Sequence, residues 1–141
     1  MKFRDYFSLK HIVFAVLLFA LLIPIALWDS NTQVKVSFDD TSVYAKSDRF
    51  GMTIGYDLIK TAALESLAAE GVKVNEDAFG DDIIRTGLWK NDTWGEYNIC
   101  ADLDTSVCVV AYLHDGRVFV FSQKDDATTE EVFKTLQSHL N

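Results

Sequence analysis

Two cysteines are the residues best able to form a covalent cross-link in this 141-residue chain. Cys100 and Cys108 lie eight positions apart, and an antiparallel hairpin turning at Asp104 would place them opposite each other on one face. In an oxidising compartment we expect a cross-strand disulfide, which for so short a loop would stabilise the domain by about 2.5 kcal/mol. The alternative is two buried thiols, which a cytosolic location would favour.

Acidic residues at two places have the spacing to raise the question of a cation site. The segment from Asp102 to Ser106 begins like a calcium loop, but Val107 stands where that loop needs glycine and Leu113 where it needs glutamate. A second acidic cluster lies in a predicted loop, and we interpret it as a solvated loop rather than a cation site: Glu76, Asp77, Asp81 and Asp82.

The histidines, at positions 11, 114 and 139, have no second His or Cys at the spacing of a metal site. His114 and Asp115 flank a predicted hairpin turn, where such residues occur for backbone reasons. The sequence contains no nucleophile elbow, phosphate loop or dinucleotide-binding glycine pattern. We therefore predict no catalytic residues, no metal and no cofactor.

The longest uncharged run covers the 17 residues 12–28 and reads IVFAVLLFALLIPIALW. As a helix it would extend roughly 26 Å, close to a hydrocarbon thickness of about 30 Å. We predict a transmembrane signal anchor in which Pro24 is tolerated and Trp28 reaches the headgroup layer. A cleaved signal peptide and a buried core helix are the alternatives. The anchoring residues would be Ile12, Phe14, Leu17, Leu21, Pro24 and Trp28.

Charge is divided unevenly around this run. The tail of residues 1–11 holds three of the 13 basic and one of the 21 acidic side chains, so ten basic and twenty acidic side chains follow the run. The positive-inside rule then predicts a cytoplasmic N-terminus and an extracytoplasmic domain after a linker at residues 29–33. The acidity of that domain argues against nucleic acid and anionic lipid as partners.

Residues 34–141 read as short alternating segments separated by turn signals. The Asp115-Gly116 dipeptide predicts a two-residue type I′ turn that sets Tyr112 opposite Phe119 and Val110 opposite Phe121. Residues 58–69 fit a strand in their first half, although their alanines also suit a helix. The remaining predicted strands are 34–38, 42–47, 52–56, 83–89, 96–102, 107–114 and 117–123.

A helix is predicted after the last strand. Thr128 and Glu131 form a capping-box pattern, and Val132, Leu136 and Leu140 recur on one face of an amphipathic helix. About seven antiparallel strands capped by this helix predict a mainly β (α+β) fold, a small closed or nearly closed barrel.

The order of these elements resembles the pleckstrin-homology-like (PH-like) domains of bacterial membrane proteins. The resemblance covers roughly Val34 to Leu140 and depends on the strand order, on residues 56–59 (YDLI), on residues 86–89 (TGLW) followed by Trp94-Gly95, and on the last hairpin leading into the helix. It implies a non-enzymatic binding or assembly module on a membrane segment, here at the bacterial inner membrane. The first hairpin loop, residues 38–41 (FDDT), lacks the basic residues of lipid-binding relatives, so we do not expect phosphoinositide binding.

Both faces of the last predicted hairpin are apolar, so either the C-terminal helix or a partner must cover the second face. We expect a protein partner or self-association at a candidate surface made of Val110, Tyr112, Phe119, Phe121, Trp89 and Trp94. The alternative function is a small-molecule or lipid-binding barrel in which these aromatic residues line a cleft.

Overall fold

The computed structural model describes residues 33–68 and 70–141. The predicted basic tail, the transmembrane helix with its anchoring residues from Ile12 to Trp28, and most of the linker lie outside the described residues. Among the residues described, no helix is long and apolar enough to cross a membrane.

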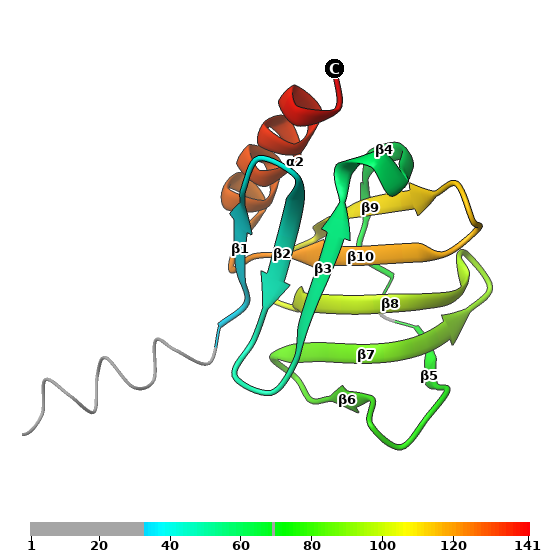
Figure 1. Ribbon diagram of the computed structural model, residues 1–141. Coiled ribbons are helices and arrows are strands. Elements are labelled where there is room, and N and C mark those ends of the chain that lie inside the picture. The colour runs from blue at the N-terminus through cyan, green and yellow to red at the C-terminus, as the bar shows by residue number, and fades with distance from the viewer. Residues whose placement is uncertain (1–32, 69) are drawn as a thin grey trace, which may run out of the picture. The chain divides into compact units, whose positions relative to one another are not determined.

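The described chain is mainly β, with two sheets and a C-terminal helix (Figure 1). The smaller sheet contains β1 (Lys35–Phe38), β2 (Ser42–Lys46) and β3 (Gly51–Gly55), and a 3₁₀ helix, Tyr56–Leu58, follows it. The larger sheet contains β4 (Ile59–Ser66), β5 (Val72–Lys73), β6 (Phe79–Gly80), β7 (Ile84–Asn91), β8 (Gly95–Asp102), β9 (Val107–Leu113) and β10 (Val118–Ser122). The helix α2 spans Asp126–Leu140.

The mainly β prediction with a C-terminal helix is therefore confirmed, and the strand predicted for the first half of residues 58–69 is present but extends further, over Ile59–Ser66. The prediction of a closed barrel is wrong. The first three strands pair only with one another, and the larger sheet has the order β4-β9-β10-β8-β7-β5, with β6 also paired to β7.

The middle of the larger sheet departs from simple hairpin order. β10 inserts between β8 and β9, antiparallel to β9 but parallel to β8. Strands β8 and β9, predicted to pair about Asp104, are consequently not neighbours. Cys100 packs on one face of the sheet and Cys108 on the other, and both are buried free thiols.

The cross-strand disulfide predicted for Cys100 and Cys108 is thus not formed, because a whole strand lies between them and their side chains point to opposite faces. Burial raises the pKa of each thiol to about 12. Both are therefore protonated at neutral pH and lack the thiolate that cysteine chemistry requires.

The β9–β10 hairpin is one residue longer than the predicted two-residue turn. Leu113 N donates to Arg117 O at 3.0 Å, so the loop consists of residues 114–116, with Gly116 at a φ of 91°. Loops of this length favour glycine in the left-handed region. Tyr112 is therefore opposite Val118 rather than Phe119. The shift exchanges the faces on which the β10 side chains lie.

Each face of the larger sheet is covered from within the domain. Phe119 and Phe121 pack against the smaller sheet and against Val132 and Leu136 of α2. The opposite face includes Tyr97, Ile99, Val110 and Val120 and is covered partly by Trp94, Leu67, Ala68 and Ala78. The helix therefore covers the hairpin face that contains Phe119 and Phe121, while Leu67, Ala68 and Ala78 of the chain itself pack on the other face.

The N-cap of the helix lies three residues before the predicted cap, Thr128. Asp125 is the N-cap, and its carboxylate accepts a hydrogen bond from Thr128 N at 2.7 Å. The next residue, Asp126, accepts from Thr105 Oγ1 at 2.6 Å and from Ser106 N at 2.7 Å. The Ser106 and Thr105 donors hold the pKa of Asp126 at about 2. The start of α2 is thereby fixed to the β8–β9 loop.

Candidate functional site

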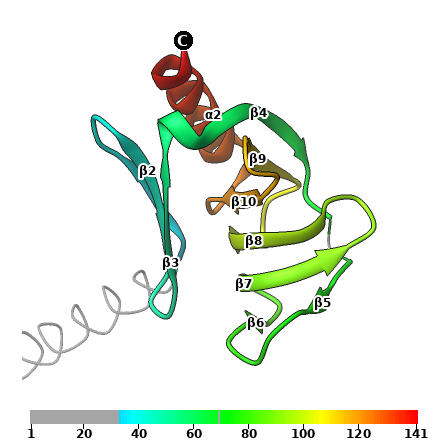
Figure 2. The same ribbon diagram turned by 45° about the vertical axis from the view of Figure 1, so that its right-hand side comes forward.

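The larger sheet is strongly curled, which brings its two ends together. Four inter-strand spacings separate β4 from β7, a distance of about 19 Å in a flat sheet. Yet Trp94, which follows β7, donates from Nε1 to Glu65 Oε1 of β4 at 3.3 Å. Figure 2 shows β4 arching over β9 toward the segment that leads to β5.

A small polar network holds this curl. Besides the Trp94 indole, Glu65 accepts a hydrogen bond from Tyr112 Oη at 2.5 Å. Burial, together with the Glu65 carboxylate, raises the pKa of Tyr112 to about 12, so the phenol remains a donor at neutral pH. Trp94 also packs edge-on against Tyr97, with ring centroids 5.1 Å apart. The network therefore fixes the turn between β7 and β8 against β4.

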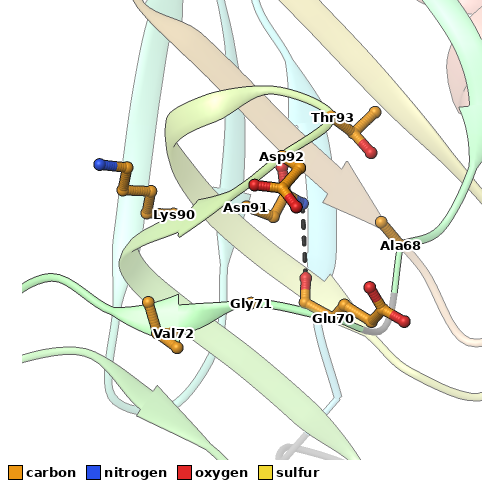
Figure 3. A pocket seen from close by; sticks show the side chains of 8 residues that line it. All are labelled: Ala68, Glu70, Gly71, Val72, Lys90, Asn91, Asp92 and Thr93. Atoms are coloured by element: carbon orange, nitrogen blue, oxygen red, sulfur yellow. Dashed lines mark hydrogen bonds between the residues drawn. The ribbon is translucent and has the colours of Figure 1, made fainter.

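The main candidate site is a cleft beside this turn, with a volume of about 690 Å³ (Figure 3). Two segments form its walls, one leading into β5 and the other containing the β7–β8 turn. Asn91 Nδ2 donates to Glu70 O at 3.4 Å and connects the two walls. The lining residues are Ala68, Glu70, Gly71, Val72, Lys90, Asn91, Asp92 and Thr93.

The turn that forms one wall is well defined. Asn91 Oδ1 accepts a hydrogen bond from Trp94 N at 2.7 Å, which closes the turn in the way Asx residues commonly do. Gly95 at its end has a φ of 67° and nothing within 4 Å of the position of a Cβ. Asp92 and Thr93 are therefore presented to solvent on a fixed backbone.

The other wall lies directly over the core. A Cβ added to Gly71 would lie 2.7 Å from Tyr97 Oη and 3.3 Å from Lys90 O. Tyr97 is fully buried, and burial raises its pKa although Arg85 and Asn91 oppose the rise. The absence of a side chain at Gly71 therefore lets this wall approach the sheet closely.

The charges of the cleft are mixed, with an acidic excess. Glu70 and Asp92 contribute carboxylates, and Lys90 contributes the basic side chain. In Figure 3 the Lys90 side chain extends away from Glu70 and Thr93. The groups remaining around the opening are two carboxylates, an amide and a hydroxyl, which suit a ligand with positive charge and hydrogen-bond donors.

The cleft continues into the open edge of the larger sheet. β5 pairs with β7 on one side and with no strand among the described residues on the other. Val72 is 65% exposed and Val74 is 40% exposed. Val74 N donates to Leu88 O at 3.0 Å, so the alternation of an antiparallel ladder directs the N–H and C=O of Lys73 outward.

The predicted interaction surface is split by the structure and largely buried. Phe119 and Phe121 lie on the face covered by α2, whereas Val110, Tyr112, Trp89 and Trp94 lie on the opposite face. Trp89 is packed by Arg85 and donates from Nε1 to Thr86 O at 2.9 Å. None of these six residues lines the cleft.

Asp81 of the acidic loop and His139 both make contacts that stabilise the fold. Asp81 accepts hydrogen bonds from Ile83 N and Ile84 N, and these lower its pKa. His139 stacks between Tyr56 and Phe38, with ring centroids 4.7 Å and 5.6 Å away. In residues 33–68 and 70–141, no group of three or more His, Cys, Asp or Glu side chains could hold a metal ion.

Sequence reasoning missed the cleft and the edge strand. The alternation Val72-Lys73-Val74 after Gly71 is a short strand pattern, and Asn91-Asp92-Thr93 is a run of residue types that are common in turns. The curl that places these segments together depends on contacts distant in sequence. Comparison of the chain with protein-family models, curated proteins and solved structures finds no match.

Proposed function

We propose that this chain is a membrane-anchored binding or assembly module without catalytic activity of its own. Residues 12–28 would form the single transmembrane helix, and residues 34–141 a PH-like domain on the extracytoplasmic side of the bacterial inner membrane. The apolar run and the positive charges before it support the anchor. The mainly β domain with its C-terminal helix is compatible with the PH-like proposal.

The observation that carries the binding role is the open β5 edge beside the cleft. Native proteins usually cover, shorten or charge their sheet edges. Here, two exposed aliphatic side chains, Val72 and Val74, flank the outward backbone groups of Lys73. We propose that a protein partner binds at this edge and cleft, rather than at the aromatic residues of the last hairpin.

Site-specific photo-crosslinking in membranes tests this role. A photoreactive phenylalanine analogue replaces Val72 in the full-length chain, and a matched variant carries it at Lys134, an exposed position on α2. We expect a cross-linked adduct of discrete mass from position 72 only. Equal adducts from both positions, or none from position 72, would overturn binding at this edge.

A reporter fusion tests the proposed topology separately. A phosphatase that is active only outside the cytoplasm is fused after Asn141, and a fluorescent protein that matures only in the cytoplasm is fused there in a second strain. We expect phosphatase activity and no fluorescence. The reverse result would contradict the extracytoplasmic placement while leaving the binding role open to the cross-linking test.

A further inference from the structure

We infer that the β5 edge and the adjoining cleft bind a short, extended, positively charged segment of another protein as an added strand. This inference rests on the proposed function and names the chemistry of the partner. It depends on three observations: the outward backbone groups of the edge, the exposed aliphatic side chains beside them, and the arrangement of charges on both.

The backbone of the edge can accept a strand over a short length. Because Val74 is bonded inward to Leu88, the ladder directs Gly71 and Lys73 outward, each with one N–H and one C=O. A strand added here gains backbone hydrogen bonds from these groups, which is the basis of β-strand addition in peptide recognition. The edge ends near Asn75, whose carbonyl accepts from Ala78 N at 3.3 Å. The partner segment is therefore short.

The side chains of the edge define what the partner presents. Val72 and Val74 alternate with Lys73, so they lie on one face of the strand and favour aliphatic residues opposite them. Glu70 lies at one end of the edge and Glu76 and Asp77 at the other, all exposed. A partner with a basic residue at each end and an acidic residue opposite Lys73 would complement this pattern.

The cleft supplies a place for one of these basic side chains. Glu70 and Asp92 line it, together with the Asn91 amide and the Thr93 hydroxyl (Figure 3). A lysine or arginine side chain entering from the added strand would find acceptors on both walls. The same charges disfavour an acidic peptide and an anionic lipid headgroup.

A second copy of this chain is a poor occupant of the edge. Antiparallel pairing of two β5 edges about Lys73 would set Lys73 opposite Lys73, and Glu70 opposite Glu76, in both directions. Like charges directly opposite each other in a sheet are destabilising. The charges of the edge therefore disfavour self-association and favour a partner whose charges are opposite to those of Glu70, Lys73 and Glu76.

A peptide-binding experiment tests the inference with the full-length chain in nanodiscs of uncharged phosphatidylcholine. The probe is a fluorescent peptide of sequence Lys-Thr-Val-Glu-Val-Thr-Lys, and its control is the charge-reversed peptide Glu-Thr-Val-Lys-Val-Thr-Glu. Fluorescence anisotropy measures both affinities at low salt. We expect the first peptide to bind about tenfold more tightly, because three cross-strand charge pairs change sign, and the difference to shrink as salt is added. Equal affinities would overturn the charge argument.

A matched pair of variants tests the edge itself. Lys73→Pro removes both the lysine charge and the outward backbone N–H. Lys73→Ala removes the same charge but keeps the N–H. Proline at an outward position of an edge strand leaves the ladder to β7 intact, which near-UV circular dichroism checks. We expect Lys73→Pro to weaken peptide binding about tenfold relative to Lys73→Ala. Equal binding by the two folded variants would overturn strand addition.

The result also separates this inference from the proposed function. If position 72 forms a specific adduct in membranes but the basic peptide does not bind, the binding module stands and the extended basic partner is wrong. If the peptide binds and no adduct forms in membranes, the edge can accept a basic strand in isolation, but the proposed binding of a partner at this edge in membranes fails.

Discussion

The two outer edges of the larger sheet are treated differently. β4, eight residues long, lies beside α2, and Gln137 Nε2 of the helix donates to Ala62 O at 3.3 Å. β5, two residues long, lies at the other end of the strand order and leaves Val72 65% exposed. A long bare edge invites aggregation, whereas a short one with charged ends can be left available. The contrast shows that the open edge at β5 extends over only two residues, while the longer edge strand β4 lies beside the helix.

The largest expected effect on stability comes from a substitution under α2, on the side of β4. Leu136 is fully buried between α2 and the sheet, and Leu136→Ala leaves a cavity there. We expect the free energy of unfolding to fall by about 2–5 kcal/mol. Chemical denaturation of the full-length chain in detergent, followed by near-UV circular dichroism, measures it. A loss below 1 kcal/mol would mean that α2 does not protect this side.

The next largest effect concerns how the segment of the open edge is held. Gly87 has a φ of 95°, and a Cβ there would lie 2.7 Å from Ala78 Cα in the segment between β5 and β6. We expect Gly87→Ala to cost about 2–3 kcal/mol of stability, since backbone must shift and the new residue is strained. Gly116→Ala is the control, because its φ is also positive but nothing lies within 4 Å. Equal losses in the two variants would refute the close approach.

A smaller effect tests the single polar contact of α2 with the covered edge. Gln137→Ala removes the hydrogen bond to Ala62 O. We expect a loss of about 0.5–1.5 kcal/mol in the free energy of unfolding and faster amide exchange in β4. Lys134→Ala, on the exposed face of α2, serves as the control. Unchanged exchange in β4 would show that the helix covers this edge by packing alone.

The attachment of α2 to the β8–β9 loop should be visible as a pH dependence. The pKa of Asp126 is lowered to about 2 in the folded chain by Ser106 and Thr105. Its contribution to stability is therefore present above the unfolded pKa of about 3.9 and is lost as pH falls toward 2. We expect Asp126→Asn to be less stable at neutral pH and to lose less stability than the natural chain between pH 4 and 2. Parallel curves of unfolding free energy against pH would contradict this.

The smallest expected effect on stability comes from a substitution at the open β5 edge. Val72→Thr changes an exposed residue whose neighbours on one side are solvent. We expect its free energy of unfolding to change by less than about 0.5 kcal/mol, while binding of the basic peptide weakens. A large loss of stability would show that Val72 belongs to the core rather than to a binding edge.

The strands that were predicted well are those whose position can be recognised from the local pattern of apolar residues and turns alone. β9 and β10 are continuous apolar runs with a turn between them, and both occur where expected. Their register was wrong by one residue, because a two-residue and a three-residue loop around Gly116 have the same local signature. That single residue moved Phe119 and Phe121 to the other face and dispersed the predicted interaction surface.

What could not be predicted depends on contacts between distant segments. No local pattern indicates that β10 lies between β8 and β9, so the pairing of Cys100 with Cys108 was deduced from a hairpin that does not exist. The cleft needs the curl fixed by Glu65 and Trp94, which are 29 positions apart. The exposure of Val72 is likewise a property of the assembled sheet.

The position of β10 has a consequence for the order of folding. The strand that is last in the chain is central in the sheet, bonded to β8 on one side and β9 on the other. The native strand order is therefore unreachable until residues 118–122 have left the ribosome. The core of the larger sheet is therefore completed late, after the strands on both sides of β10 have been made.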